Sequence, residues 1–169
     1  MNQETFEPDE YFIELLEENH PDAYANILGS AENPTLQGTV KFYSAGDGTL
    51  VEAIIFGLPH DTLHSSRFYG FHIHENGNCS QNNTNESFPY TGNHFNPTNA
   101  DHPFHAGDLP PILSANGIGI LSVFTDAFRV IDIIERSIIL HDGPDDFTSQ
   151  PSGMSGNKIA CGVIMPYHY

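Results

Sequence analysis

Basic side chains are scarce in this chain of 169 residues: 5 Lys and Arg stand against 22 Asp and Glu, which gives a formal net charge of -17. Nucleic acids and anionic membranes are bound through clustered Lys and Arg, so the composition argues against both kinds of partner. No apolar run approaches the roughly 20 residues that cross a bilayer. Because the start, MNQETFEPDEYF, lacks the basic and apolar regions of a signal peptide, a cytoplasmic location is expected.

Cysteine is also scarce, and the two that are present, Cys79 and Cys161, lie far apart in the sequence. This separation excludes a CxxC redox motif, and a metal site built on these thiols would need further ligands. Taken alone, two cysteines in a cytoplasmic protein are expected to be reduced thiols.

Glycine and proline are frequent, with 15 Gly and 12 Pro, and turn clusters separate short runs rich in β-branched and aromatic residues. This pattern is typical of an all-β domain with many short strands. The segments LQGTVKFYS and TLVEAIIFGL flank the turn AGDG and predict a hairpin. Four further strands are predicted in RFYGFHIHE, NGIGILSVFTD, RSIILHD and KIACGVIM.

Residues 1–34 are acidic and are expected to form an extension ahead of a single domain, residues 35–169. Within the extension, Phe12, Leu15 and Leu16 recur at helical spacing. A short amphipathic helix laid against the domain is therefore expected, and packing is the simplest role for such a stripe.

Two long polar segments separate the predicted strands: residues 76–111 and the stretch GPDDFTSQPSGMSG. Segments of this length in compact domains are usually functional or disordered. Of ten histidines, four are isolated in polar or terminal settings, as expected for surface residues: His20, His60, His64 and His168. The other six lie at predicted strand ends or in the first long loop: His72, His74, His94, His102, His105 and His141.

The first long loop contains a compact set of ligand-type residues. In HFNPTNADHPFHAGD, the histidines His94, His102 and His105 precede Asp108. Three nitrogens and one carboxylate suit a tetrahedral zinc site, because zinc accepts both kinds of donor. A histidine-rich solvated loop is the alternative.

A second set of histidines lies on predicted strands. His72 and His74 face the same way because side chains alternate along a strand, while Phe71 and Ile73 face the other way. With His141 and one loop histidine they would form a four-imidazole site. Such a site favours Cu(II), but imidazole also suits zinc, iron and nickel, so spacing does not choose the metal.

Five segments, in this order, resemble the copper/zinc superoxide dismutase family: GFHIHE, GNHFNP, HAGDLP, RSIILHDGPDD and GNKIACGVI. The resemblance implies a Greek-key β-barrel or sandwich, immunoglobulin-like, with two long functional loops. It further implies superoxide as the substrate, copper and zinc as cofactors, and a homodimer as the assembly to test.

The resemblance also implies roles for individual residues. Copper would be held by His72, His74, His94 and His141. Zinc would be held by His94, His102, His105 and Asp108. His94 would therefore bridge both metals and supply a proton, and Asp145 would link a copper histidine to a zinc histidine. Cys79 and Cys161 would form a disulfide instead of remaining reduced.

Three features depart from the family pattern. Lys158 stands where the family has an arginine that attracts and orients superoxide. Lysine keeps the charge but lacks the planar fork, so a functional but slower enzyme is expected. Glu135 replaces a family glycine, and the spacing between His102 and His105 is short compared with that in familiar animal members. These two departures bear on the dimer contact and the loop geometry. A dismutase-like module that stores or delivers copper, or that holds only zinc, is the alternative function.

Overall fold

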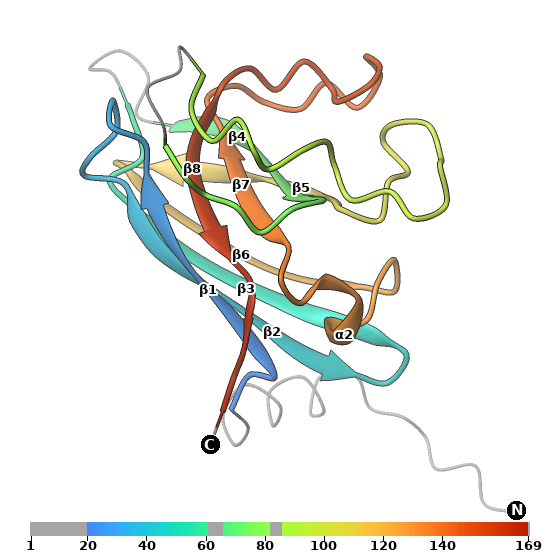
Figure 1. Cartoon of the computed structure of the whole chain (residues 1–169). Coiled ribbons are helices and arrows are strands. Elements are labelled where there is room, and N and C mark those ends of the chain that lie inside the picture. Colours follow the sequence, from blue (N-terminus) through green and yellow to red (C-terminus); the bar gives the residue numbers. More distant parts are fainter. Residues whose placement is uncertain (1–19, 61–65, 82–85, 169) are drawn as a thin grey trace, which may run out of the picture.

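The computed structural model describes residues 20–60, 66–81 and 86–168. Within them, nine strands and one short helix are found (Figure 1). The strands are β1 (Ala23–Gly29), β2 (Gln37–Ala45), β3 (Gly48–Phe56), β4 (Ser66–His74), β5 (Asp108–Ala115), β6 (Ile118–Thr125), β7 (Ser137–His141), β8 (Lys158–Val163) and β9 (Met165–Pro166). The helix is α2 (Val130–Ile133).

The strands form an antiparallel barrel in the order β2-β3-β6-β5-β4-β7-β8-β1, which closes because β1 also pairs with β2. β3 pairs with β6 and β4 pairs with β7, so the chain crosses over twice between strands that are not consecutive. This connectivity, together with the closed all-β architecture, confirms the predicted Greek-key barrel.

Side-chain alternation explains how the barrel fills its interior. On β3, Val51, Ala53 and Ile55 are fully buried, whereas Ile54 and Phe56 are 40% and 47% exposed. The inward residues belong to a core that includes residues from β1 to β5, β7, β8 and the region around α2, and Leu121 and Val123 of β6 pack against it. The hairpin of β2 and β3 is thus formed as the sequence predicts, with Ala45 opposite Gly48 at its turn.

Two strands of the barrel were not predicted. Residues 23–29, which lie in the predicted extension, form β1 and pair with β2 and β8, so the barrel begins before residue 35. β5 begins at Asp108, so the first long loop ends before this residue and not at 111. The predicted helix of the extension lies outside the described residues.

The two long loops lie on the same side of the barrel, near β4 and β7 (Figure 1). Gly70 on β4 allows the loop of residues 142–157 to approach the strand closely, since an added Cβ would lie 2.8 Å from the Cβ of Ser155. The first loop is tied to β8 by a disulfide between Cys79 and Cys161, whose Cα atoms are 5.7 Å apart. The disulfide confirms the pairing implied by the family resemblance.

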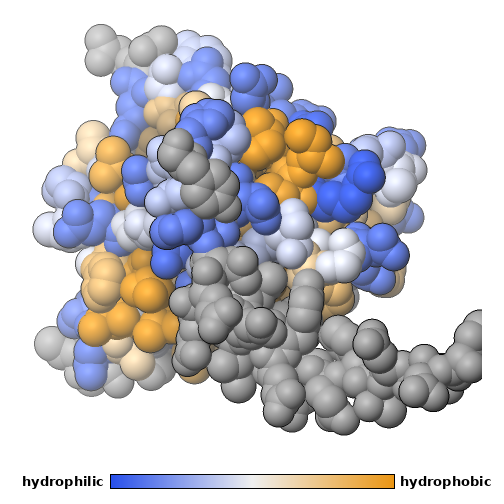
Figure 2. Space-filling model, turned by 90° about the horizontal axis from the view of Figure 1, so that it is seen from below, coloured by the Kyte–Doolittle hydropathy of each residue, from blue (hydrophilic) through white to orange (hydrophobic). Residues whose placement is uncertain are grey.

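The outer surface mixes hydrophobic and hydrophilic residues, as the view from below shows (Figure 2). On β3 and β6, for example, Ile54 and Ile120 are cross-strand partners and both are exposed. Across the described ranges, no helix combines the length and the apolar character that a membrane crossing requires.

Candidate metal centre

β4 presents two histidines toward the long loops. Phe71 and Ile73 point into the core and are fully buried, so His72 and His74 between and beyond them lie on the outer face of the strand. His141 ends the neighbouring strand β7, and its place beside β4 follows from the pairing of these two strands.

His94 joins these strand histidines from the first loop through an isolated β-bridge to His74. The structure therefore brings His72, His74, His94 and His141, all buried, into one cluster, which we call the four-histidine group. Each of its members offers one ligand atom, and these atoms lie within 4.8 Å of one another.

The orientation of three of these rings is fixed by a hydrogen bond from the nitrogen that faces away from the cluster. His72 Nε2 donates to Asp145 Oδ2 at 2.8 Å. His74 Nδ1 donates to the carbonyl of Gly92 at 2.9 Å, and His141 Nδ1 donates to the carbonyl of Gly156 at 3.3 Å. The remaining nitrogens converge, as the 3.4 Å separation of His74 Nε2 and His141 Nε2 shows. Partners of this kind are typical of metal-binding histidines.

A second cluster, which we call the aspartate group, consists of His94, His102, His105 and Asp108. The Nδ1 atoms of the three histidines surround the Asp108 carboxylate, at 2.6 Å for His94, 3.0 Å for His102 and 3.2 Å for His105. Donors around a tetrahedral zinc ion with bonds near 2.1 Å lie roughly 3.4 Å apart. The four donors therefore lie close enough together to surround one metal ion.

Unpaired nitrogens give an independent test of the fit. Within the described residues, four buried imidazole nitrogens of the two groups have no hydrogen-bond partner: His72 Nδ1, His94 Nε2, His102 Nδ1 and His105 Nδ1. A buried polar atom without a partner costs about 1–3 kcal/mol. Bound metal ions would satisfy all four, so the donor sets of both groups fit metals.

Two residues connect the groups. His94 belongs to both, with Nδ1 beside Asp108 and Nε2 left for the four-histidine group. Asp145 accepts hydrogen bonds from His72 Nε2 at 2.8 Å and from His102 Nε2 at 2.9 Å. At Gly153, with φ of 68°, an added Cβ would collide with Asp145 and lie 2.7 Å from His102 Nε2, so the loop can pack here only with glycine.

The electrostatics of the cluster favour neutral imidazoles and ionised carboxylates. Burial lowers the pKa of His72, holds that of His74 well below 6.5 and lowers that of His141 to about 3. Burial acts to raise the pKa of Asp145, but hydrogen bonds from His72, the Phe147 amide and His102 outweigh it and hold the pKa well below the usual range. These are the protonation states that metal binding needs.

Comparison with known proteins shows the family to which the chain belongs. The profile of the family described as copper/zinc superoxide dismutase matches residues 36–164. The chain belongs to the copper/zinc superoxide dismutase family. The family membership and the two ligand groups together identify copper and zinc as its cofactors.

Relatives in this family differ in their named roles. The copper/zinc superoxide dismutase of Deinococcus radiodurans is 32% identical over 164 residues, which cover 85% of this chain and 84% of that protein. The copper chaperone for superoxide dismutase of Homo sapiens is 34% identical over 144 residues, which cover 77% of this chain but 48% of the chaperone. The solved structure of the Brucella abortus copper/zinc superoxide dismutase has a TM-score of 0.69 and 25% sequence identity, and the match covers 83% of this chain and 98% of that one.

All seven ligand-type residues predicted for this dismutase-family chain are thus brought together, and Asp145 lies between them. Lys158 pairs with His141 in the β7–β8 register and lines the same cleft, of about 480 Å³, as His74, His94 and His141. The isolated histidines His20, His60 and His168 are exposed and belong to neither group, and His64 lies outside the described residues.

Sequence reasoning missed the backbone acceptors. The carbonyls of Gly92 and Gly156, which orient His74 and His141, leave no mark in residue type, because every residue has a carbonyl. It also missed Glu86, whose carboxylate lies 3.5 Å from the ammonium of Lys158. Only the fold brings these atoms to the site.

The lowered histidine pKa values predict that the metal-free protein loses stability below about pH 6.5. The unfolded chain takes up protons near pH 6.5, whereas folded His141 does so only near pH 3, so stability falls throughout this window. The lowered pKa of Asp145 acts in the same direction below pH 3.8, because the unfolded carboxylate is protonated first. Thermal unfolding of the metal-free protein between pH 8 and pH 4 measures the histidine contribution.

The matched control is a pair of asparagine variants. His141→Asn should weaken the pH dependence of the melting temperature, whereas the same change at exposed His168 should leave this dependence unaltered. A melting temperature that stays constant from pH 6.5 to pH 4 in the unaltered protein would contradict the prediction.

Proposed function

We propose that the protein is a superoxide dismutase that holds copper in the four-histidine group and zinc in the aspartate group. The observation that carries this proposal is the presence of two complete ligand sets that share His94. Four imidazole nitrogens suit copper, and three imidazoles with one carboxylate suit zinc.

The reaction converts two superoxide anions and two protons to oxygen and hydrogen peroxide. Copper supplies the one-electron redox couple for this conversion, and zinc supplies fixed positive charge and structural support. We assign to His94 Nε2 the acceptance of a proton and its delivery to the reduced product, while Nδ1 stays beside Asp108. Asp145 holds His72 and His102 in fixed tautomers through its two oxygens.

Substrate access is assigned to the cleft beside the four-histidine group. Among the described residues that line it, Lys158 is the only Lys or Arg, whereas Glu75 and Asp101 add negative charge. Because the whole chain carries a formal charge of -17, an anion is attracted only by the local positive charge of the metals and Lys158.

A metal-delivery module is the second candidate, and the match to the human copper chaperone favours it. Such a module would bind copper in the same four histidines but turn over little superoxide. A homodimer and a cytoplasmic location stay predictions from the sequence.

Metal analysis combined with a dismutation assay tests the proposal. After loading with copper and zinc, we expect one ion of each per chain and rapid, metal-dependent loss of superoxide. Tight copper binding without turnover would favour the delivery module. Zinc binding alone would contradict both copper-dependent functions.

The lysine at position 158 predicts a rate between those of an arginine and a neutral residue. Lys158→Arg should raise kcat/KM, because the planar guanidinium can orient superoxide through two hydrogen bonds. Lys158→Gln should lower kcat/KM by about tenfold at low ionic strength, through loss of the attracting charge. Stopped-flow decay of superoxide at several salt concentrations measures both. Equal kcat/KM for the lysine and arginine forms would show that orientation by the fork is unimportant here.

A further inference from the structure

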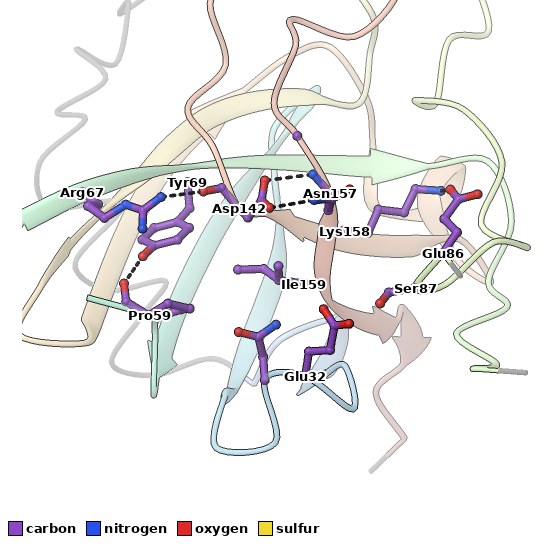
Figure 3. A pocket seen from close by; sticks show the side chains of 12 residues that line it. Glu32, Pro59, Arg67, Tyr69, Glu86, Ser87, Asp142, Asn157, Lys158 and Ile159 are labelled. Atoms are coloured by element: carbon purple, nitrogen blue, oxygen red, sulfur yellow. Dashed lines mark hydrogen bonds and ion pairs between the residues drawn. The ribbon is translucent and has the colours of Figure 1, made fainter. Parts of the chain in front are cut away.

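Lys158 lies at the boundary of two pockets. It lines the cleft that holds the four-histidine group, and it also lines a second pocket of about 820 Å³. Figure 3 shows this second pocket, with Arg67 and Asp142 on one side and Lys158 with Glu86 on the other. The position of the Lys158 ammonium therefore affects the positive side-chain charge that the metal cleft receives.

The ammonium is held by two residues of the first long loop. Lys158 Nζ donates to Glu86 Oε1 at 3.5 Å and to the carbonyl of Phe88 at 3.4 Å. The Lys158 side chain is 13% exposed, whereas that of Glu86 is 67% exposed. The carbonyl can hold the ammonium without cancelling its charge, but the carboxylate opposes that charge directly.

We propose that Glu86 is a positioning residue that restrains anion binding at the metal cleft, by pairing with Lys158 and offsetting its charge. The proposal rests on the proposed function in one respect, that the natural anion is superoxide. Its physical basis is local: a carboxylate 3.5 Å from the only Lys or Arg among the described cleft residues weakens the attraction for any small anion.

The expected size of the effect is modest because Glu86 is largely exposed to water. Partly exposed ion pairs change equilibria by about twofold to fivefold, and salt screens them. Removing the carboxylate should therefore raise anion affinity by about this factor at low ionic strength, and the gain should disappear at high salt.

The chain offers a matched control. Glu32 is a second carboxylate that lines the pocket of Figure 3, and no contact between it and Lys158 is observed. Glu32→Gln and Glu86→Gln change the net charge equally. A difference between the two variants therefore reports the pairing with Lys158 and not the overall charge.

Azide titration of the copper- and zinc-loaded protein, followed by its optical spectrum, tests the proposal. We expect about twofold to fivefold tighter azide binding in Glu86→Gln and no change in Glu32→Gln. In the Lys158→Gln background, the change at Glu86 should have no effect. Weaker azide binding in Glu86→Gln, or equal effects of the two glutamine variants, would overturn the proposal.

A measurement without metal separates this proposal from the proposed function. In the metal-free protein, acetylation of Lys158, quantified by mass spectrometry, should be faster in Glu86→Gln than in Glu32→Gln, since the ion pair shields the amine. Azide binding and acetylation that respond as expected in a protein without turnover would refute the dismutase function and leave the role of Glu86 intact. Unchanged acetylation in both variants would overturn the pairing itself.

Discussion

Replacing His141 by alanine is expected to abolish dismutation and to remove copper while leaving zinc bound. His141 belongs to the four-histidine group but not to the aspartate group, so only one ligand set is broken. Loss of a partner that merely orients a ligand costs about 10–100-fold in metal affinity, and loss of the ligand itself should cost at least as much. Activity should therefore fall by more than about a hundredfold.

The measurement combines metal content with the initial rate of superoxide loss, at equal protein concentration. His168→Ala serves as the control, because His168 is exposed and lies outside both groups. Asp108→Ala should give the converse pattern, with zinc lost in preference to copper. Full activity in His141→Ala would refute the assignment of copper to the four-histidine group.

Removal of the disulfide is expected to produce the largest loss of stability. In the Cys79→Ser, Cys161→Ser double variant, the unfolded chain is no longer closed over a sequence separation of 82 residues. The chain-entropy treatment of such a loop gives a decrease of about 4.5 kcal/mol in the free energy of unfolding. Urea denaturation of the metal-free double variant, beside the oxidised parent protein, measures this.

The same variant should also weaken the attraction of anions by Lys158. Cys79 and Cys161 pack with Phe88 and Ile139, and the carbonyl of Phe88 holds the Lys158 ammonium.

Chemical reduction of the parent protein provides the control for the stability experiment, since it breaks the disulfide without changing any residue and should reproduce the decrease in stability. A decrease below about 1 kcal/mol in both experiments would show that the disulfide constrains the unfolded chain little.

Much of the fold could be predicted from local patterns, and the failures have physical reasons. β2 and β3 were predicted because apolar and polar residues alternate around a glycine-containing turn. β5 was missed because Pro110 and Pro111 lie within it, and proline normally excludes a paired strand. The ladder between β4 and β5 is irregular between Tyr69 and Phe71, and neither proline is among its paired residues.

β1 was missed for a different reason. Its sequence, AYANILG, follows an acidic segment and contains two alanines, which carry little hydrophobic signal. In the barrel, Ala23 and Ala25 are fully buried beside β2, where a small side chain fits the closed sheet. Only the pairing with β2 and β8 shows that this strand completes the barrel.

The sequence by itself determined the ligand types, their order and the shared face of His72 and His74, because strand alternation is a local property. The tertiary structure decided which nitrogen of His72, His74 and His141 is presented to a metal. Asp145 and the carbonyls of Gly92 and Gly156 occupy the other nitrogens, and each acceptor comes from a distant part of the chain. A ring nitrogen is directed by the hydrogen bond that its partner nitrogen makes, and that bond exists only once the loops have packed on the barrel.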